Sequence, residues 1–321
     1  MVREASSRRS IRRSRTMHAI PTMLANAAHS PTRRLQEAAA PSSCGFSVDC
    51  PLTYSLADIN ASAAEWDPFE PTWRREFRRR RDAAQFACLP HEHQSRFANR
   101  SVWTRRETTE QGGWCLKHNK PGQVELPNNE SYSLPYPHIA AEQGLVDLLL
   151  SDELSRSTRV DQRLRINDFG AGVGQYGHAL LSRDPRFRWR GFDGAGNVEA
   201  FTSGFVEWFD LTMPLSLPKS DWVLCLEVGE HVPNAFEAMV VRNLHAHNLR
   251  GLVLSWAVPN QTGTAHINNH RNGYIRRIFT GLGYVHNDRL ATTLRHRAAW
   301  PHSLWLKHTI MVFERWVPLS G

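Results

Sequence analysis

A glycine-rich turn between a strand and a helix constrains the fold of this chain more than any other feature. In the segment INDFGAGVGQYG, Gly170, Gly172 and Gly174 follow an apolar strand that we predict over 164–169. Glycine accepts positive φ and has no Cβ, so the backbone can turn sharply and approach a ligand. A helix predicted over 176–182 would then point unpaired N–H groups at that ligand. The turn predicts an α/β sheet with a binding site at its edge.

The elements that follow the turn alternate between strand and helix. Strands separated by helices imply right-handed crossovers and a parallel sheet. The last two strand-like stretches, 284–294 and 306–316, have no helical pattern between them, which predicts that they pair antiparallel. The other predicted elements are a helix over 136–154, strands over 187–193, 205–209, 222–226 and 252–258, and helices over 232–249 and 274–280.

The glycine turn fits two kinds of cofactor. Residues 172–177 (GVGQYG) match the dinucleotide fingerprint GxGxxG, and Asp193 follows at the spacing expected of the acid that binds ribose. Asp168, just before Gly170, favours the second kind. It would repel a pyrophosphate, but it tolerates a cationic amino group and a sulfonium. A nicotinamide-dependent oxidoreductase stays open as an alternative.

Residues 168–174 (DFGAGVG) resemble motif I, DxGxGxG, of the class I S-adenosylmethionine-dependent methyltransferases, and the resemblance extends over 136–321. It implies a Rossmann-like α/β fold whose mostly parallel seven-stranded sheet ends in an antiparallel hairpin. It also implies that Asp193 binds the ribose hydroxyls, that Asp210 faces the adenine, and that Leu211 packs on the adenine ring. The residues that the resemblance assigns to S-adenosylmethionine are Asp168, Gly170, Gly172, Gly174, Asp193, Asp210, Leu211 and Glu227.

A second motif, EVGEH at 227–231, follows the strand predicted over 222–226. It fits ExxEH and resembles the metal-binding motif of the ubiquinone-pathway (type 11) O-methyltransferases and of the small-RNA 3′-terminal 2′-O-methyltransferases. The second group supplies another histidine from a later loop, a part that His266 or His270 can play here. Carboxylate and imidazole donors together suit Mg²⁺ or Mn²⁺. The predicted ligands are Glu227, Glu230, His231 and His266.

The same motif has an interpretation without a metal. Glu227 would contact the cofactor, while Glu230 and His231 would begin the next helix, where a carboxylate is stabilised by the helix dipole. In either case a hydroxyl acceptor needs a base. His231 is the first candidate and His266 the second, because a neutral imidazole titrates near working pH. Trp114 and Trp256 are candidates to wall the acceptor pocket, although tryptophans are also common in cores. The predicted catalytic residues are therefore His231 and His266.

These features predict an enzyme that methylates a small molecule at oxygen. Because a sulfonium already carries an activated methyl group, catalysis would come mainly from in-line positioning and the exclusion of water. One alternative is an RNA 2′-O-methyltransferase that uses ExxEH. Two others are the oxidoreductase and an inactive methyltransferase-like binding module, since a fold can persist after its activity is lost. The acceptor and the oligomeric state stay open.

Positive charge is concentrated in the N-terminal third of the chain. Residues 1–110 contain 18 Arg and no Lys against 12 acidic residues, whereas residues 111–321 contain 21 basic and 19 acidic residues. A polyanion-binding enzyme would carry a basic face on its folded domain, so this distribution argues against nucleic acid as the obligatory substrate. The run RREFRRRR at 74–81 is either an RNA contact or a solvated helix face.

The chain is expected to divide into four segments. Residues 1–43 are rich in Arg and Ser, which resembles an organellar transit peptide but also fits a disordered basic tail. Residues 44–110 are an Arg-rich extension of low order, and 111–135 are a lid or lead-in segment rich in turn residues. Residues 136–321 form the methyltransferase domain.

The cysteines and the apolar runs bear on location. The five cysteines include no CxxC pair and one lies in a predicted buried strand, so we expect no disulfide framework and no cysteine-based zinc site. This predicts a reducing, intracellular compartment, either cytoplasmic or organellar. No run approaches the ~18 apolar residues of a membrane span.

Overall fold

The computed structural model describes most of the C-terminal two-thirds of the chain and two helices before it. The predicted transit-like segment, 1–43, lies outside the described residues, as does the whole stretch from 90 to 113. The described residues are 52, 54–64, 71–89, 114–125, 131–136, 140–155, 164–263, 265–297 and 304–316.

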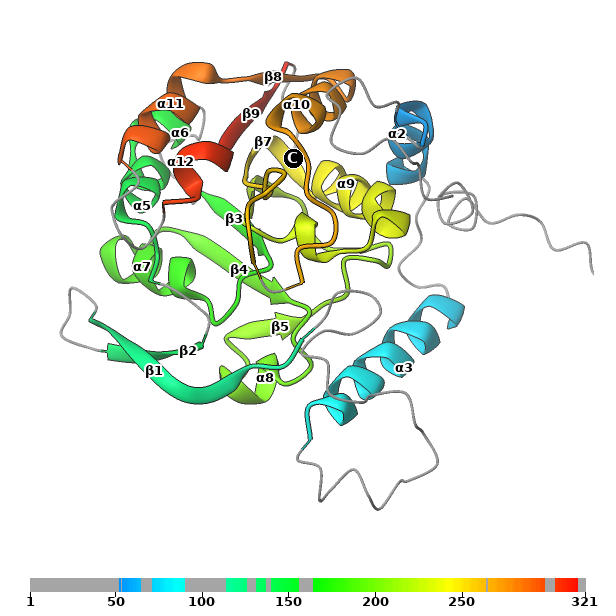
Figure 1. Ribbon diagram of the computed structural model, residues 1–321, viewed down its shortest axis with the longest axis vertical. Coiled ribbons are helices and arrows are strands. Elements are labelled where there is room, and N and C mark those ends of the chain that lie inside the picture. Colours follow the sequence, from blue (N-terminus) through cyan, green and yellow to red (C-terminus); the bar gives the residue numbers. More distant parts are fainter. Residues whose placement is uncertain are drawn as a thin grey trace, which may run out of the picture.

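A seven-stranded sheet in the order β5-β4-β3-β6-β7-β9-β8 forms the centre of the structure (Figure 1). The five strands from β5 to β7 in this order are parallel, and β9 is antiparallel to both of its neighbours. This order, with one reversed strand in the final pair, is that of the class I methyltransferase fold, and the predicted fold class is confirmed. The strands are β3 Arg165–Phe169, β4 Arg188–Asp193, β5 Val206–Trp208, β6 Ser220–Cys225, β7 Asn248–Leu254, β8 Tyr284–His286 and β9 Met311–Arg315.

Helices cover both faces of the sheet, and each face has its own apolar core. Alternate residues of one strand serve the two cores: Trp222 and Leu224 of β6 pack into one, and Val223 and Cys225 into the other. This alternation follows from the two-residue period of a strand. Helices α5 Gln143–Leu150, α7 Gln175–Arg183, α11 Asp288–Arg297 and the short α6 Asp152–Ser155, α8 Val198–Phe201 and α12 Leu306–Thr309 lie on the first side, and α2 Leu56–Ala64, α9 Glu237–Ala246 and α10 Asn272–Gly281 on the second.

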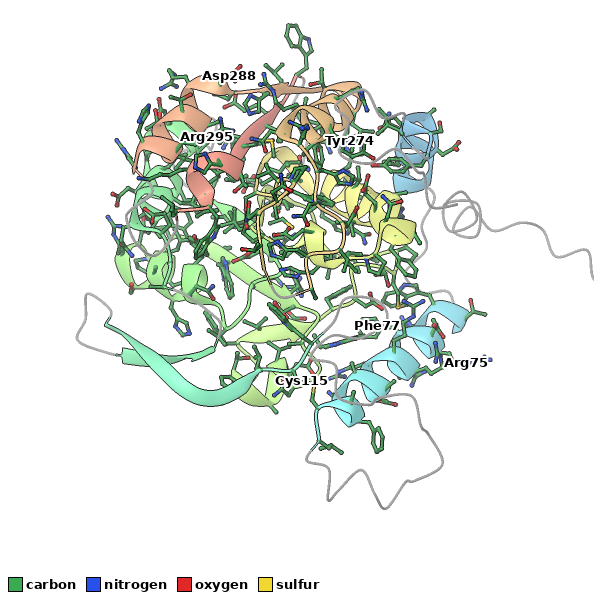
Figure 2. All side chains as sticks on the ribbon, viewed as in Figure 1. Arg75, Phe77, Cys115, Tyr274, Asp288 and Arg295 are labelled. Atoms are coloured by element: carbon green, nitrogen blue, oxygen red, sulfur yellow. A yellow bond between two sulfur atoms is a disulfide. The ribbon has the colours of Figure 1, made fainter. Side chains whose placement is uncertain are left out.

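Helix α3, Pro71–Ala87, carries the arginine-rich run and packs beside the edge strand β5 (Figure 1). Phe77 lies edge-on to the rings of Trp208 and Phe209, at 5.3 and 5.4 Å between centroids. In Figure 2, Phe77 points toward the sheet, whereas Arg75 points outward. The apolar side of the helix therefore packs against the aromatic residues at the end of β5. The predicted lid segment contains a hairpin of β1 Lys117–Glu125 and β2 Ser131–Tyr136.

The two terminal strands exist but are much shorter than the predicted stretches 284–294 and 306–316. After β8 the chain forms helix α11, so a helix does lie between the last two strands. The side chain of Asn287 accepts a hydrogen bond from the backbone N–H of Leu290, at 2.9 Å, and Asp288 stands in the first turn. Asn followed by Asp is a helix-start signal that the apolar residues around it obscured.

The helix and strand predicted over 232–249 and 252–258 have shifted boundaries. Pro233 interrupts the helix, so short 3₁₀ turns at Gly229–His231 and Asn234–Phe236 come before α9. Strand β7 then begins at Asn248, well before the apolar run. Gly251 lies within β7, where a Cβ would come 2.2 Å from the carbonyl oxygen of Phe313. Polar and small residues at the start of this strand hid its period.

Two cysteines form a disulfide, contrary to the sequence prediction. Cys88, just after α3, is bonded to Cys115, while Cys225 is free and buried in β6. The pairing depends on α3 lying alongside residues 114–116, which the spacing of the cysteines does not reveal. The cysteines therefore give no support for a reducing compartment. Among the described residues, no helix has the length and apolarity needed to cross a membrane.

Candidate functional site

The glycine turn leaves β3 at the carboxyl edge of the sheet. Gly170, Gly172 and Gly174 have φ of 77°, 59° and 81°, values that favour glycine. The backbone N–H of Gly170 donates to the carbonyl of Phe192 at 2.7 Å. A Cβ at Gly170 would lie 2.1 Å from the side chain of Val228, so the turn also packs closely on the loop after β6.

Asp193, the last residue of β4, holds the glycine turn in place. Its carboxylate accepts hydrogen bonds from the backbone N–H groups of Gly172 and Ala195, both at 2.8 Å. The carboxyl of Asp168 lies buried beneath the turn and accepts a hydrogen bond of 3.3 Å from the indole N–H of Trp189. Burial raises the pKa of Asp168 to about 8, although the bond from Trp189 lowers it. A cationic group at the turn would favour the charged form.

The acid assigned to the adenine side is engaged by helix α3. Asp210 follows β5, and its carboxylate accepts a hydrogen bond of 2.8 Å from the guanidinium of Arg80 and one of 2.8 Å from the backbone N–H of Thr212. Leu211 is half-buried against the second core. The arginine-rich helix therefore reaches the predicted cofactor site, a contact between residues 130 positions apart that no local pattern indicates.

Residues 114–116 lie between the end of α3, to which a disulfide joins them, and the loop after β4. The backbone N–H of Gly196 donates to the carbonyl of Trp114 at 2.9 Å, and Leu116 exchanges two hydrogen bonds with the side chain of Asn197. The ring of Trp114 lies 5.4 Å from that of His231. We name residues 114–116 the strap; it is tied to α3 by the disulfide at Cys115, labelled in Figure 2.

Three of the four predicted metal ligands lie together. Glu230, His231 and His266 each offer a ligand atom within 4.8 Å of the others. Glu230 is fully buried, and neither of its carboxylate oxygens makes a hydrogen bond of good geometry with a described residue, although the backbone N–H groups of Glu230 and Ala257 and the carboxyl of Glu227 lie close to them. Burial, and then the charge of Glu227, raise the pKa of Glu230 well above its ordinary value. A cation at this cluster would supply the positive charge that stabilises the ionised carboxylate.

The fourth predicted ligand, Glu227, is not part of that cluster. Its φ of 55° is unusual for a residue with a side chain. One carboxylate oxygen accepts a hydrogen bond of 2.6 Å from the amide of Gln261, and the other accepts one of 3.0 Å from the hydroxyl of Thr309. Both partners lie far away in sequence, so the motif alone could not indicate them.

The two later histidines have different environments. Nδ1 of His266 lies 3.1 Å from the carbonyl oxygen of Gln261, so a proton on Nδ1 leaves Nε2 available as a ligand or base. Nε2 of His270 lies 2.5 Å from the buried carboxylate of Glu237. Of the two, His266 is therefore the one placed at the cluster. Trp256 is fully buried and belongs to the second core.

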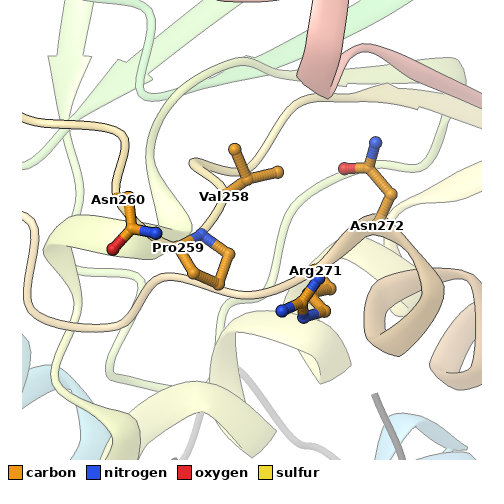
Figure 3. Close-up of a pocket in the computed structure, with 5 residues that line it drawn as sticks. All are labelled: Val258, Pro259, Asn260, Arg271 and Asn272. Carbon is orange, nitrogen blue, oxygen red and sulfur yellow. The ribbon is translucent and has the colours of Figure 1, made fainter. Parts of the chain in front are cut away.

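The loop that supplies His266 also lines a cavity of about 400 Å³ (Figure 3). In Figure 3 the guanidinium of Arg271 lies across the opening from the amide of Asn260. One cationic side chain and two side-chain amides therefore line the cavity. Its lining residues are Val258, Pro259, Asn260, Arg271 and Asn272.

Comparison with known proteins yields structural likenesses only. No family model matches the sequence, and no curated protein matches it. Magnesium protoporphyrin IX methyltransferase from Synechocystis PCC 6803 is 21% identical over 54% of this chain and 79% of that chain, with a TM-score of 0.36. An amino pentose methyltransferase from Micromonospora echinaspora is 14% identical over 54% and 89%, with a TM-score of 0.39. The cyclase SpnF is 15% identical over 57% and 84%, with a TM-score of 0.34.

These likenesses concern the fold, and a fold does not fix the reaction that a protein catalyses. The sheet order and the positive-φ glycine turn are properties of this chain itself. Together they give the chain the fold of the class I S-adenosylmethionine-dependent methyltransferases, with a sharp glycine turn at the carboxyl edge of its sheet.

Proposed function

We propose that the protein transfers the methyl group of S-adenosylmethionine to a hydroxyl oxygen of a small molecule, with a divalent cation bound by Glu230, His231 and His266. One observation carries the proposal. A fully buried carboxyl, which makes no hydrogen bond of good geometry with any described residue, lies beside two imidazoles at the same sheet edge as the glycine turn. A carboxylate in such a place is costly unless a cation neutralises it.

The glycine turn fits the cofactor. S-adenosylmethionine would supply an activated methyl group on a sulfonium. The positive φ of Gly172 keeps the turn open toward the ligand, and Asp193 fixes its position through the backbone N–H. Asp193 is also the acid that we assign to the ribose hydroxyls. Asp168, buried and with one indole donor, suits a nearby cationic group.

The ligand set fits Mg²⁺ or Mn²⁺, with the two imidazoles favouring Mn²⁺. The cation would lower the pKa of a hydroxyl bound to it. Gln261 would support the metal ligands without binding the cation itself. Its carbonyl accepts from Nδ1 of His266, and its amide holds Glu227 beside the cluster. Such outer contacts orient the ligands of a metal site.

His231 and His266 have alternative roles that depend on the cation. Without a cation, a neutral imidazole of His231 can accept the proton of the acceptor hydroxyl. With both imidazoles on the cation, neither could accept it; the cation would lower the pKa of the hydroxyl, whose proton would then pass to a water molecule. The half-buried Trp114 above His231 would limit access of water in either case.

Calorimetric titration with S-adenosylmethionine and S-adenosylhomocysteine tests the proposal, with NADH as the control and with Mn²⁺ or EDTA present. We expect micromolar binding of the two sulfur compounds, none of NADH, and saturable binding of Mn²⁺ that EDTA reverses. Binding of NADH alone would favour the oxidoreductase. Absence of all binding to folded protein would favour the inactive module.

One observation favours RNA as a second class of acceptor. On α3, which reaches the predicted cofactor site through Arg80, four further arginines of the run are exposed: Arg74, Arg75, Arg78 and Arg79. Phosphate contacts through these residues would make RNA binding fall steeply with salt. Replacing Arg74, Arg75 and Arg78 with Gln should then weaken RNA binding and flatten its salt dependence. Unchanged binding would exclude this surface as the RNA contact.

A further inference from the structure

A second buried acid, Glu237 at the start of α9, is surrounded by donors. Its carboxylate is fully buried. One oxygen accepts hydrogen bonds from the hydroxyls of Tyr54, at 2.9 Å, and Tyr274, at 2.6 Å. The other accepts from the amide of Asn268, at 3.1 Å, and from Nε2 of His270, at 2.5 Å. In contrast to Glu230, this acid has its hydrogen bonds satisfied.

Two of those donors belong to the loop that supplies His266. The backbone N–H of Asn268 donates to the carbonyl of Glu230 at 3.0 Å, and the backbone N–H of Ile267 donates to the same carbonyl at 2.9 Å. The indole of Trp256 donates to the carbonyl of Asn268 at 2.6 Å. Asn268 is therefore bonded on one side to Glu237 and on the other to the backbone of a predicted ligand.

His270 fixes the end of the same loop. Its backbone N–H donates to the carbonyl of Ala257 at 3.0 Å, and its ring stacks on that of Tyr274 at 4.1 Å. Burial raises the pKa of Glu237, but the hydrogen bond and charge of His270 outweigh burial and hold that pKa below its ordinary value. The anionic form of Glu237 is thus matched to the loop donors that surround it.

We propose that Glu237 is a positioning residue that sets the place of His266 in the cluster by holding Asn268 and His270. The inference rests on the proposed function, because it concerns the same cluster. Two anchors, two and four residues after His266, leave that histidine little freedom relative to Glu230. Glu237 itself touches neither the cofactor turn nor the cluster.

The decisive variant is Glu237→Gln, which keeps the size of the side chain and an oxygen for the two tyrosines. Its amide would face the donors of Asn268 and His270 and release the loop. We expect Mn²⁺ affinity to fall by about 10- to 100-fold, as when an outer-shell partner of a metal ligand is lost. Affinity for S-adenosylmethionine should not change. Unchanged Mn²⁺ affinity in the folded variant would overturn the proposal.

Tyr54→Phe is the matched control. It removes one hydrogen bond to Glu237 from a residue outside the loop, so Mn²⁺ affinity should stay at the level of the unaltered protein. A loss equal to that of Glu237→Gln would mean that any disturbance of the buried acid acts on the cluster. Glu237 would then have no specific role toward the loop.

A double-mutant cycle separates positioning from general stabilisation. If Glu237 acts through His266, Glu237→Gln should cost little further Mn²⁺ affinity once His266→Ala is present. Additive losses would contradict that route. Hydrogen exchange of the backbone amides of Ile267 and Asn268 provides a measurement that needs no metal. Both amides should exchange faster in Glu237→Gln. If the unaltered protein binds no Mn²⁺, the proposed metal fails, while the exchange data still decide whether Glu237 holds the loop.

Discussion

The carboxyl edge of the sheet has two halves that are built differently. In the cofactor half, after β3 and β4, side-chain oxygens bond to backbone N–H groups: Asp193 accepts from Gly172 and Ala195. In the half that we propose for the acceptor, after β6 and β7, side chains from separate loops converge, and among the described residues the buried Glu230 carboxyl makes no hydrogen bond of good geometry. The first half has its hydrogen bonds in place before any ligand arrives. In the second half, burial favours the protonated form of Glu230, and a bound cation would be needed to ionise it.

The difference predicts that the halves can be disabled separately. The strap contacts both, since Trp114 lies near His231 while its carbonyl accepts from Gly196. Variants of the glycine turn should leave cation binding unaltered, and variants of the cluster should leave cofactor binding unaltered. Coupled losses would mean that the edge is one cooperative site.

The largest effect is expected for Glu230→Gln. Removing the charge should weaken Mn²⁺ binding beyond the about 100-fold that losing an outer-shell partner costs, with no effect on S-adenosylmethionine binding. Calorimetry with each ligand checks both. Glu207→Gln, at an exposed acid paired with Arg190, is the control and should change neither. Mn²⁺ binding that survives Glu230→Gln would remove Glu230 from the ligand set.

The same variant carries a prediction about pH. The pKa of Glu230 is higher in the folded protein than in the unfolded chain, so the folded state binds more protons. Without metal, the free energy of unfolding should fall as pH rises from the ordinary glutamate range toward the raised pKa. Glu230→Gln should reduce that fall, and Asp168, with its pKa of about 8, should account for a remaining part. Thermal unfolding across this range, with and without Mn²⁺, measures it.

Gly172→Val should produce the next largest effect, on the other half. A β-branched residue at φ of 59° is strained by about 1–3 kcal/mol, and its side chain would stand in the turn. We expect S-adenosylmethionine affinity to fall by about 100-fold with Mn²⁺ affinity intact. Gly204→Val provides the control, because Gly204 has a similar φ of 79° but open space around it. Equal losses in both variants would point to instability rather than to the turn.

Asp193→Ala should have a smaller effect in the same half. It leaves two buried N–H groups without acceptors and removes the predicted contact to ribose. At about 1 kcal/mol for each lost hydrogen bond, affinity for S-adenosylmethionine should fall by about 10- to 100-fold. Asp193→Asn, which retains one acceptor oxygen, should lose less. Unchanged affinity in folded Asp193→Ala would withdraw the ribose assignment.

The sequence predicted the local features of the sheet edge better than the contacts between distant elements. The positions of Gly170, Asp193 and Glu227 at strand ends were predictable, because strand periodicity and glycine spacing are local. The partners of these acids were not, since Arg80, Gln261 and Thr309 come from elements whose packing no pattern encodes. ExxEH indicated the cluster, but only the folded loop separates His266 from His270.

The smallest effect on the site is expected from the disulfide, which tests whether α3 and the strap join the two halves. Cys88→Ser should lower the free energy of unfolding by about 2–4 kcal/mol, the usual value for a native disulfide. Affinities for S-adenosylmethionine and Mn²⁺ should fall only a few-fold, because Gly196, Asn197 and Arg80 still hold the strap and α3. A dithiol reductant should reproduce the effect in the unaltered protein and add nothing to Cys88→Ser. Loss of one ligand alone would assign the strap to that half of the edge, whereas equal small losses would show that it spans both.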